Sequence, residues 1–133
     1  MDVSSSIQAF LDGSPHAVVG ASTDRAKYGN KCLRCYQQAG RPVFPVNPRA
    51  DEVEGLPGYS DLASLPDVPH GVTVVTPPSV TEMVIEEAAA AGVRNVWLQP
   101  GAESPAAVAR AEELGLNVIA GGPCLLVALG YRE

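Results

Sequence analysis

The chain contains five short apolar segments, and each of them ends at a turn that contains glycine or proline. They span residues 16–20, 42–46, 71–75, 93–98 and 117–120. Short continuous apolar runs are typical of strands that are buried on both faces of a sheet. Segments with helical spacing of apolar residues lie between them, so strands and helices alternate along the chain. This alternation predicts an α/β fold with a doubly wound, parallel, five-stranded sheet and right-handed crossovers.

We expect the strand order 3-2-1-4-5, with the order reversing between the first and fourth strands. A chain of 133 residues has the length of one ordinary domain. No linker, internal repeat or low-complexity stretch marks a boundary, so residues 1–133 are interpreted as a single domain. Pro45 lies inside the second apolar segment and predicts a bulge or an irregular sheet edge there.

Several helix boundaries carry local signals. Ser79 with Glu82 three residues later matches a capping box, which predicts a helix whose apolar face includes Val80. Ser104 followed by Pro105 predicts a second helix start, with serine as the N-cap residue and proline at the first helical position. An amphipathic N-terminal helix is expected over residues 5–11.

Composition excludes several classes of protein. The formal net charge of −6 and the pI near 4.8 argue against binding of duplex nucleic acid or an anionic membrane, since both require a broad basic face. No apolar run approaches the roughly 20 residues of a membrane span, and residues 1–11 do not match a signal peptide. We therefore expect a cytoplasmic protein.

The three cysteines are expected to be reduced thiols, because an odd number without a secretion signal does not indicate a disulfide framework. Cys32 and Cys35 form a C-x-x-C inside a helical pattern, but no second pair or clustered histidine completes a zinc site. We expect no metal, and we interpret both residues as small core side chains.

The basic residues are segregated. The segment 25–49 holds six of the nine and no Asp or Glu, namely Arg25, Lys27, Lys31, Arg34, Arg41 and Arg49. Lys31 and Arg34 are interpreted as a solvated helix face, but the segment also spans the first strand-to-helix turn and the end of the second strand. Both positions lie at one edge of the predicted sheet, so the segment predicts a local positive field for a small polyanion.

Ligands of doubly wound sheets bind beyond the carboxyl ends of the strands. In this chain a turn follows each of these strand ends. The glycine, hydroxyl and cationic groups of these turns suit a phosphate, and the start of the following helix can supply N–H donors. Gly20 by itself is equally consistent with a tight turn that binds nothing. The candidate cofactor-binding residues are Gly20, Ala21, Ser22, Arg25, Lys27, Tyr28, Val46, Asn47, Pro48, Arg49, Thr76, Pro77, Pro78, Gln99, Pro100, Gly101 and Cys124.

The second strand indicates which nucleotide is bound. An NAD site would carry G-x-G-x-x-G and an acidic residue after this strand, but the chain has one glycine in 20–25 and ends the strand in Asn47-Pro48-Arg49. An arginine at this position suits a ribose that bears its own phosphate. This leaves coenzyme A, with its 3′-phosphate, and NADP, with its 2′-phosphate.

The same motifs resemble a known family. The chain is similar to the small stand-alone CoA-binding proteins, which share the Rossmann-like CoA domain of the succinyl-CoA synthetase alpha subunit. The resemblance covers roughly Ser14 to Leu129 and rests on Val19–Ser22, Pro45–Arg49, Gly55 with Tyr59 and Leu62, Val96–Gly101 and Gly115–Val118.

The resemblance implies coenzyme A across the strand ends. It places the pyrophosphate at Gly20–Ser22 with Lys27 nearby, the adenosine beside Val46–Arg49, and the pantetheine along Thr76–Pro78. The thiol end would then lie toward Gln99–Gly101 and Cys124. Two positions depart from the family: the turn Thr76-Pro77-Pro78, and Gly122-Pro123, where relatives commonly have an Asp or Asn and an Arg.

The matching position of Cys124 suggests a mixed disulfide with CoA. The alternative is a buried structural cysteine, which we favour from the sequence because no neighbouring His or Lys would lower the pKa of the thiol.

Three functions remain open. They are binding of CoA or acyl-CoA without turnover, NADP-linked redox chemistry, and service as a partner subunit of an acyl-CoA ligase. The resemblance implies a phosphorylatable histidine on a second domain for the ligase, whereas His16 and His70 precede strands at the opposite sheet edge and are expected to be capping or exposed residues. We expect no catalytic residue, and we favour binding alone. A second copy packed on the apolar tail 125–129 is the other partner considered.

Overall fold

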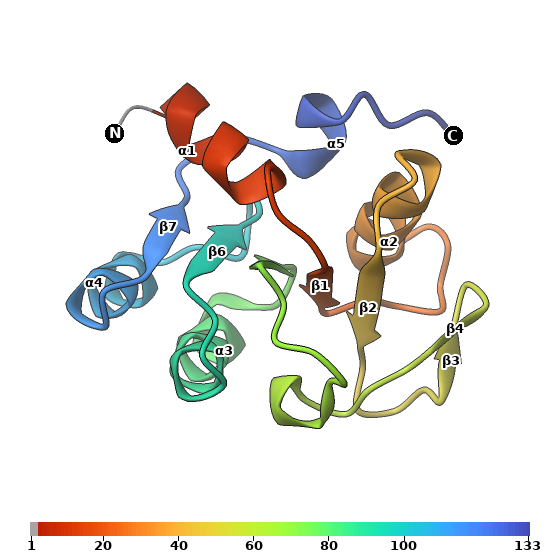
Figure 1. The fold of residues 1–133 in the computed structure, drawn as a ribbon, viewed down its shortest axis with the longest axis horizontal. Helices are drawn as coiled ribbons and strands as arrows, with labels where there is room; N and C mark the ends of the chain where they lie inside the picture. Colours follow the sequence, from red (N-terminus) through yellow and green to blue (C-terminus); the bar gives the residue numbers. More distant parts are fainter. Residues whose placement is uncertain (1–2) are drawn as a thin grey trace.

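The five apolar segments form one parallel sheet in a computed structural model, which describes residues 3–133 (Figure 1). In chain order the strands are β1 (His16–Val19), β2 (Val43–Val46), β5 (Gly71–Val74), β6 (Asn95–Leu98) and β7 (Asn117–Ile119). Every neighbouring pair in this sheet is parallel. The α/β class and the parallel five-stranded sheet are therefore confirmed.

The predicted strand order 3-2-1-4-5 is wrong. The observed order is β2-β1-β5-β6-β7, so the third apolar segment pairs with β1 on the side away from β2, and β2 lies at the edge. Pro45 gives the physical reason. Its carbonyl points away from β1 and accepts the Tyr59 N–H at 3.0 Å. The N–H of a strand residue points to the same side as its carbonyl, and proline has none. A further strand on this outer side of β2 could therefore not form a complete set of hydrogen bonds. Among residues 3–133, Tyr59 is the one that pairs there, in a parallel bridge to Val46.

Helices cover both faces of the sheet. On one face α3 (Pro78–Ala90) and α4 (Pro105–Glu113) pack together, and on the other lie α1 (Val3–Leu11), α2 (Tyr28–Gln38) and α5 (Leu125–Ala128) (Figure 1). Residues along β1 alternate between the two cores: Ala17 and Val19 pack with the α3 and α4 side, and Val18 packs with the α2 side. Burial on both faces explains why the strands read as continuous apolar runs.

Helix starts only partly follow the local signals. Ser104 caps α4 as predicted, since its hydroxyl accepts the Ala107 N–H at 3.0 Å. The capping box predicted at Ser79 is wrong, because α3 begins at Pro78 and its N-cap residue is Pro77. Proline has a preset φ and is favoured at a first helical position, so the helix starts two residues earlier than predicted. Val80 is consequently exposed.

The stretch between β2 and β5 contains an additional hairpin, which the apolar pattern did not predict. Strands β3 (Glu52–Val53) and β4 (Leu56–Pro57) pair antiparallel, and the 3₁₀ helix η1 (Leu62–Ser64) follows, with Asp61 as its capping residue. This segment carries the chain from the edge strand β2 back to the centre of the sheet.

At the amino ends of the strands, His16 is fully buried and therefore not exposed, but it does cap a helix, since its ring faces the last turn of α1. Helix α1 covers this part of the sheet, and the His16 Nε2 lies 2.8 Å from the Phe10 carbonyl oxygen. His70 is half-buried, and its Nε2 lies 2.9 Å from the Ala9 carbonyl oxygen. Both histidines therefore anchor α1 to the sheet.

Cys32 and Cys35 are buried on the inner side of α2, which confirms that they are core residues. Burial raises the pKa of both thiols, that of Cys35 to about 11. None of the helices formed by residues 3–133 combines the length and the apolar character that a membrane crossing requires.

Candidate functional site

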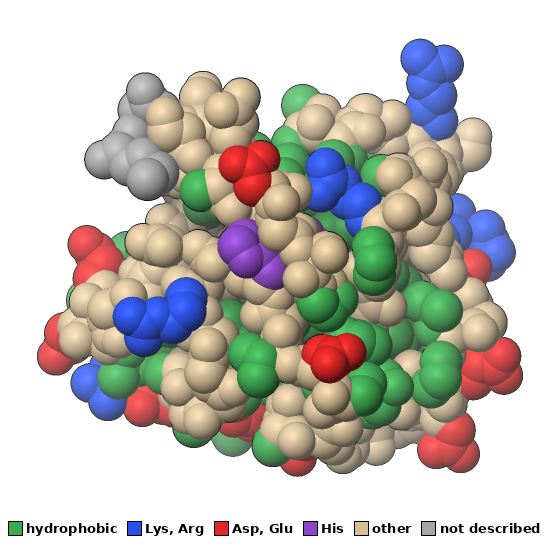
Figure 2. All heavy atoms as spheres, viewed as in Figure 1, with side chains coloured by type: hydrophobic (Ala, Val, Ile, Leu, Met, Phe, Trp, Pro, Cys, Tyr) green, Lys and Arg blue, Asp and Glu red, His purple; other side chains and the backbone are tan. Residues whose placement is uncertain are grey.

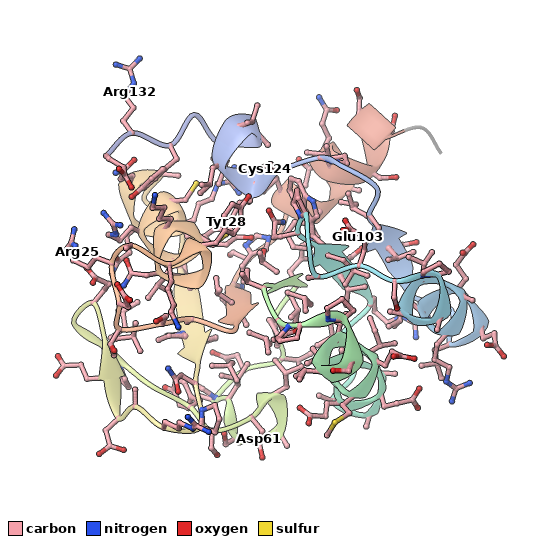
Figure 3. The ribbon with its side chains drawn as sticks, turned by 180° about the vertical axis from the view of Figure 1, so that it is seen from behind. Arg25, Tyr28, Asp61, Glu103, Cys124 and Arg132 are labelled. Atoms are coloured by element: carbon pink, nitrogen blue, oxygen red, sulfur yellow. The ribbon has the colours of Figure 1, made fainter. Side chains whose placement is uncertain are left out.

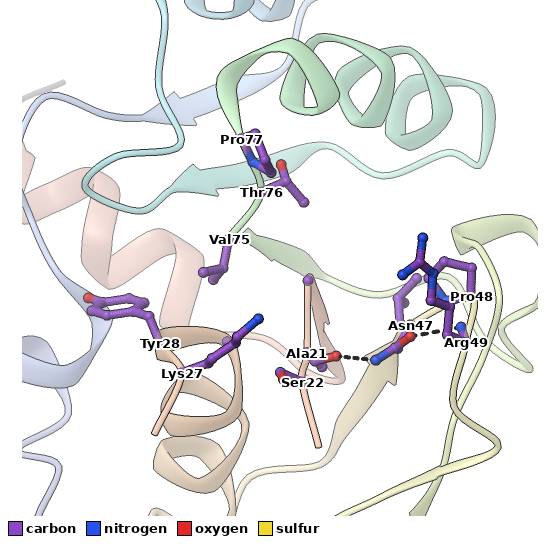
Figure 4. Close-up of a pocket in the computed structure, with 13 residues that line it drawn as sticks. Ala21, Ser22, Lys27, Tyr28, Asn47, Pro48, Arg49, Val75, Thr76 and Pro77 are labelled. Atoms are coloured by element: carbon purple, nitrogen blue, oxygen red, sulfur yellow. Dashed lines mark hydrogen bonds between the residues drawn. The ribbon is translucent and has the colours of Figure 1, made fainter. Parts of the chain in front are cut away.

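A cavity of about 690 Å³ opens at the carboxyl ends of β1, β2 and β5 (Figure 4). It lies at the sheet edge where the sequence predicted a ligand. Three successive turns surround it. The residues that line it are Gly20, Ala21, Ser22, Lys27, Tyr28, Gly29, Val46, Asn47, Pro48, Arg49, Val75, Thr76 and Pro77.

Two glycines bring the walls of this cavity together. A Cβ atom at Gly20 would lie 2.0 Å from the Val75 carbonyl oxygen, and the φ of Gly20 is +96°. A Cβ atom at Gly29 would lie 1.9 Å from the carbonyl oxygen of Gly20. Only glycine permits these approaches, so Gly20 and Gly29 place the start of α2 directly against the end of β1.

The start of α2 has N–H groups without a side-chain cap. Its N-cap residue is Lys27, which has the extended backbone of a cap residue but no acceptor to offer. The first N–H groups of a helix have no partner within the helix, and together with the helix dipole they attract anions. Lys27, Tyr28 and Gly29 all line the cavity, so this helix start faces it.

The basic segment 25–49 divides into two groups. Lys27 and Arg49 line the cavity and form no salt bridge with any acidic residue among residues 3–133. The other four contact the protein itself: Arg25 pairs with Glu54, Lys31 pairs with Glu133, Arg34 bonds to Asn30, and Arg41 bonds to the Leu11 carbonyl. Lys27 and Arg49 are therefore the two cations of this segment that line the cavity and are available to a ligand.

These two cations are local features in an acidic molecule. In the close-up, Lys27 and Arg49 extend from different turns beside the cavity, with Thr76 and Pro77 on a third side (Figure 4). Elsewhere, basic and acidic side chains are mixed over the face shown in Figure 2. A free ammonium and a free guanidinium around one cavity suit a ligand with separated anionic groups.

Asn47 ties two of the turns together. Its Nδ2 donates to the Ala21 carbonyl at 2.8 Å, and its Oδ1 accepts the Arg49 N–H at 2.8 Å (Figure 4). The turn after β2 is therefore held against the turn after β1, and Arg49 starts from a fixed backbone position.

Tyr28 connects the cavity to Cys124, which lies close to it in Figure 3, and to Gln99. Its hydroxyl lies 3.2 Å from the Gln99 Oε1 and also contacts the Cys124 thiol. Burial and the contact with Cys124 raise the pKa of Tyr28, so the hydroxyl stays protonated at neutral pH. Cys124 is only partly buried, unlike the other two cysteines.

The amide of Gln99 has a defined orientation. Its Oε1 accepts the Leu125 N–H at 2.9 Å, which fixes the oxygen toward α5 because a backbone N–H can only donate. Gln99 is fully buried, and its Nε2 has no hydrogen-bond partner among the described residues.

Of the seventeen residues predicted for the site, eleven line this cavity. The cavity has thirteen lining residues, and the two that were not predicted are Gly29 and Val75. Pro78, Pro100 and Gly101 are exposed at the same sheet edge outside the lining, and Gln99 and Cys124 lie behind Tyr28. Arg25 lies outside as well, turned toward Glu54.

Gly29 and Val75 line the cavity and were not predicted. Gly29 had a signal, because a glycine in the first turn of a helix costs helix stability and so indicates a close approach. Val75 lies just beyond the strand residues of β5, and nothing in its type marks it. Within residues 3–133, no three His, Cys, Asp or Glu side chains gather where they could hold a metal ion.

Comparison with known proteins gives consistent similarities. Residues 15–130 match the model of a family described as the CoA binding domain. The II subunit alpha of the ADP-forming acetate–CoA ligase of Pyrococcus furiosus is 35% identical over 90 residues, which are 65% of this chain. The chain spans only 19% of that protein and 11% of the ADP-forming acetate–CoA ligase of Methanocaldococcus jannaschii.

Solved structures show the same likeness. A conserved hypothetical protein from Pyrococcus furiosus superposes with a TM-score of 0.83 at 40% identity, over 87% of this chain and 99% of that one. A protein from Thermus thermophilus gives 0.85 at 29% identity, over 96% of each chain. The apo dinucleotide-forming acetyl-coenzyme A synthetase 1 of Candidatus Korarchaeum cryptofilum gives 0.74 at 31% identity, over 84% of this chain and 27% of that one.

Proposed function

The chain belongs to the family of CoA binding domains, and on that premise we propose that it binds coenzyme A or acyl-CoA in the cavity above β1 and β2, without turnover of its own. The observation that carries the proposal is the pairing of an uncapped helix start with two unpaired cations around one cavity. A diphosphate suits the start of α2 and Lys27, and a ribose phosphate suits Arg49.

The position of Arg49 supports CoA over NAD. It follows β2, where a dinucleotide site for NAD would need an acidic residue to bind the ribose hydroxyls. NADP also bears a ribose phosphate and is the alternative ligand. The family favours CoA over NADP.

The test is a thermal-shift series with CoA, dephospho-CoA, acetyl-CoA, NADP and NAD at equal concentrations. At a hundredfold excess over Kd, a specific ligand stabilises the protein by about 3 kcal/mol, which is readily measured. We expect CoA to raise the Tm most and dephospho-CoA less. A larger shift with NADP would establish the alternative ligand instead.

Arg49→Ala then tests where the ribose phosphate binds. We expect this variant to respond about equally to CoA and dephospho-CoA, because the guanidinium that distinguishes them is gone. Arg94→Ala is the control, since Arg94 is exposed and does not line the cavity. A preference for CoA that survives in Arg49→Ala would place the 3′-phosphate elsewhere.

The thiol end of the ligand is proposed to lie toward Tyr28 and Cys124. Cys124 is the partly buried cysteine, so we expect it to be alkylated by iodoacetamide well before Cys32 and Cys35, and CoA to slow that reaction. Peptide mass mapping with and without CoA measures both effects. Alkylation of Cys124 at an unchanged rate with saturating CoA would show that the ligand ends elsewhere.

The same residue tests the mixed disulfide. In thiol–disulfide exchange the Cys124 thiolate would attack CoA disulfide, forming the protein–CoA disulfide and releasing one CoA thiolate. Intact mass without reductant would then increase by one CoA in the wild type and not in Cys124→Ser. An unchanged wild-type mass would leave Cys124 as a structural residue.

A second candidate is a CoA-binding partner subunit of an acyl-CoA ligase, because one relative is the alpha subunit of such an enzyme. In this chain His16 is buried and His70 bonds to the Ala9 carbonyl, both at the sheet edge opposite the cavity. We therefore expect the chain alone to form no acetyl-CoA from acetate, CoA and ATP. Turnover by the isolated chain would contradict both candidates.

A further inference from the structure

Glu54 occupies an unusual backbone position at the tip of the β3–β4 hairpin. Its φ is +49°, and it is the one non-glycine residue with positive φ among residues 3–133. Side chains other than glycine, asparagine and aspartate rarely adopt this conformation, because the Cβ crowds the backbone. A glutamate here requires compensating contacts elsewhere.

Those contacts all go to α2 and to the loop before it. One carboxylate oxygen of Glu54 accepts from Arg25 at 3.0 Å, and the other accepts from the Asn30 Nδ2 at 3.0 Å. The Glu54 carbonyl accepts from the Gln37 side chain at 3.0 Å. The carboxylate is mostly sheltered, with 17% of its side chain exposed.

Asn30 carries the connection to the cavity. It is fully buried, and its Nδ2 also donates to the Ser22 carbonyl at 2.8 Å. Arg34 donates to the Asn30 Oδ1 at 2.6 Å and to the Arg25 carbonyl at 2.8 Å. Two carbonyls of the loop 22–27 are therefore held toward α2, and in a planar trans peptide the N–H that follows Ser22 points the opposite way.

We propose that Glu54 and Asn30 form a clasp that holds the loop 22–27 in the conformation that binds the diphosphate of the ligand. Both are positioning residues, since they act through Ser22 and Arg25 and neither lines the cavity. The identity of the ligand rests on the proposed function. That Glu54 and Asn30 hold the loop 22–27 in place does not depend on it. The clasp also explains why Glu54 keeps a positive φ and why Arg25 pairs with Glu54 and does not face the cavity.

Glu54→Gln tests the clasp because two explanations predict opposite signs. Removing a negative charge near an anion site should strengthen binding of a polyanion if only Coulomb attraction matters. In the clasp, the glutamine NH₂ group would face a donor of Asn30 or Arg25, and the loop would loosen. We expect the affinity for CoA and for dephospho-CoA to fall equally, by about tenfold, with their ratio unchanged.

Two further variants separate positioning from charge and from folding. Glu52→Gln removes the same charge from an exposed position on the same hairpin, and we expect its CoA affinity not to fall. Glu54→Gly relieves the positive φ, so we expect its Tm to be no lower than that of the wild type while its affinity still falls about tenfold. Wild-type affinity in Glu54→Gln or in Glu54→Gly would overturn the clasp.

Amide hydrogen exchange in the ligand-free protein tests the clasp without any ligand. The N–H groups of Asp24, Ala26 and Lys27 are hydrogen-bonded within the loop, and we expect them to exchange about tenfold faster in Glu54→Gln and unchanged in Glu52→Gln. If the wild type does not bind CoA, the proposed function fails while this measurement still decides the clasp. Unchanged exchange in Glu54→Gln would overturn it.

Discussion

The amino and carboxyl ends of the strands, here called the amino edge and the carboxyl edge of the sheet, differ in whether their polar side chains have partners within the protein. At the amino edge, His16, His70 and Asn95 each bond to a backbone carbonyl, at 2.8, 2.9 and 2.9 Å. At the carboxyl edge beside β1 and β2, the start of α2 has no side-chain cap, and Lys27 and Arg49 have no acidic partner among the described residues.

This difference separates residues that stabilise the fold from residues that are free to bind. A polar group that already has a protein partner contributes to folding, and its loss should lower stability and leave binding intact. A polar group without a partner contributes little to folding. Substitutions at the two edges should therefore give opposite patterns of stability and affinity.

The largest effect is expected from His16 at the amino edge. Its Nε2 must carry the proton that the Phe10 carbonyl accepts, and its buried Nδ1 has no hydrogen-bond partner within residues 3–133. Burial lowers the pKa of His16 from 6.5 to about 4, an effect that the Phe10 hydrogen bond partly opposes. Between these values the unfolded chain binds a proton that the folded chain does not, so stability falls as the pH drops.

We expect the His16 effect to remove about 3 kcal/mol of unfolding free energy between pH 6.5 and pH 4. Urea unfolding measured across this range gives the slope. His16→Gln can still donate to the Phe10 carbonyl but does not titrate, so its stability should depend less on pH. Equal slopes in His16→Gln and wild type would show that other groups control acid stability.

The next effect concerns Lys27 at the carboxyl edge. Lys27→Ser places a good capping residue at the start of α2, so the unfolding free energy should rise by about 1 kcal/mol. The same change removes the ammonium and occupies an N–H donor, so the affinity for CoA should fall about tenfold. Calorimetric unfolding and titration with CoA measure the two changes.

Lys31→Ser is the matched control for Lys27→Ser, because Lys31 is on the same helix and pairs with Glu133 outside the cavity. Its CoA affinity should stay at the wild-type value. If Lys27→Ser lost stability or kept its affinity, the start of α2 would not be an open anion site.

The smallest effect is expected at Asn95, on the amino edge. Its Nδ2 donates to the His70 carbonyl, and its Oδ1 accepts from Asn117 at 3.0 Å. Asn95→Ala should lower the unfolding free energy by about 1 kcal/mol without changing the affinity for CoA. Chemical denaturation and titration of this variant check both; weaker CoA binding would mean that the two edges are coupled.

Much of the fold could be predicted because the strands are buried on both faces and their apolar runs are unbroken. The strand order could not be predicted in the same way, because it depends on whether β2 has a neighbouring strand on its outer side. Pro45 contained this information, since a residue without an N–H favours an edge, but its outward direction depends on the register with β1. The hairpin tip at Glu54 likewise depends on contacts with α2, which local sequence does not show.

Site residues could be predicted where a residue able to bind a ligand directly follows a strand. Gly20 and Arg49 illustrate this, because strand ends of a parallel sheet meet at one edge. The charges were less predictable. Arg25 and Lys27 look alike in the sequence, and only the fold shows that Arg25 faces Glu54 while Lys27 faces the cavity. The contact of Tyr28 with Cys124 joins residues too far apart in the chain for spacing to reveal it.

The single bridge of Tyr59 to β2 limits how copies of this chain can associate. Pro45 has no N–H to offer, and the Tyr59 N–H and carbonyl are engaged with Pro45 and Asn47. An exposed strand edge can pair with a strand from a neighbouring molecule, and Pro45 and the Tyr59 bridge make the outer side of β2 a poor site for such pairing. Strand addition is therefore less hindered along the other edge strand of the sheet, β7.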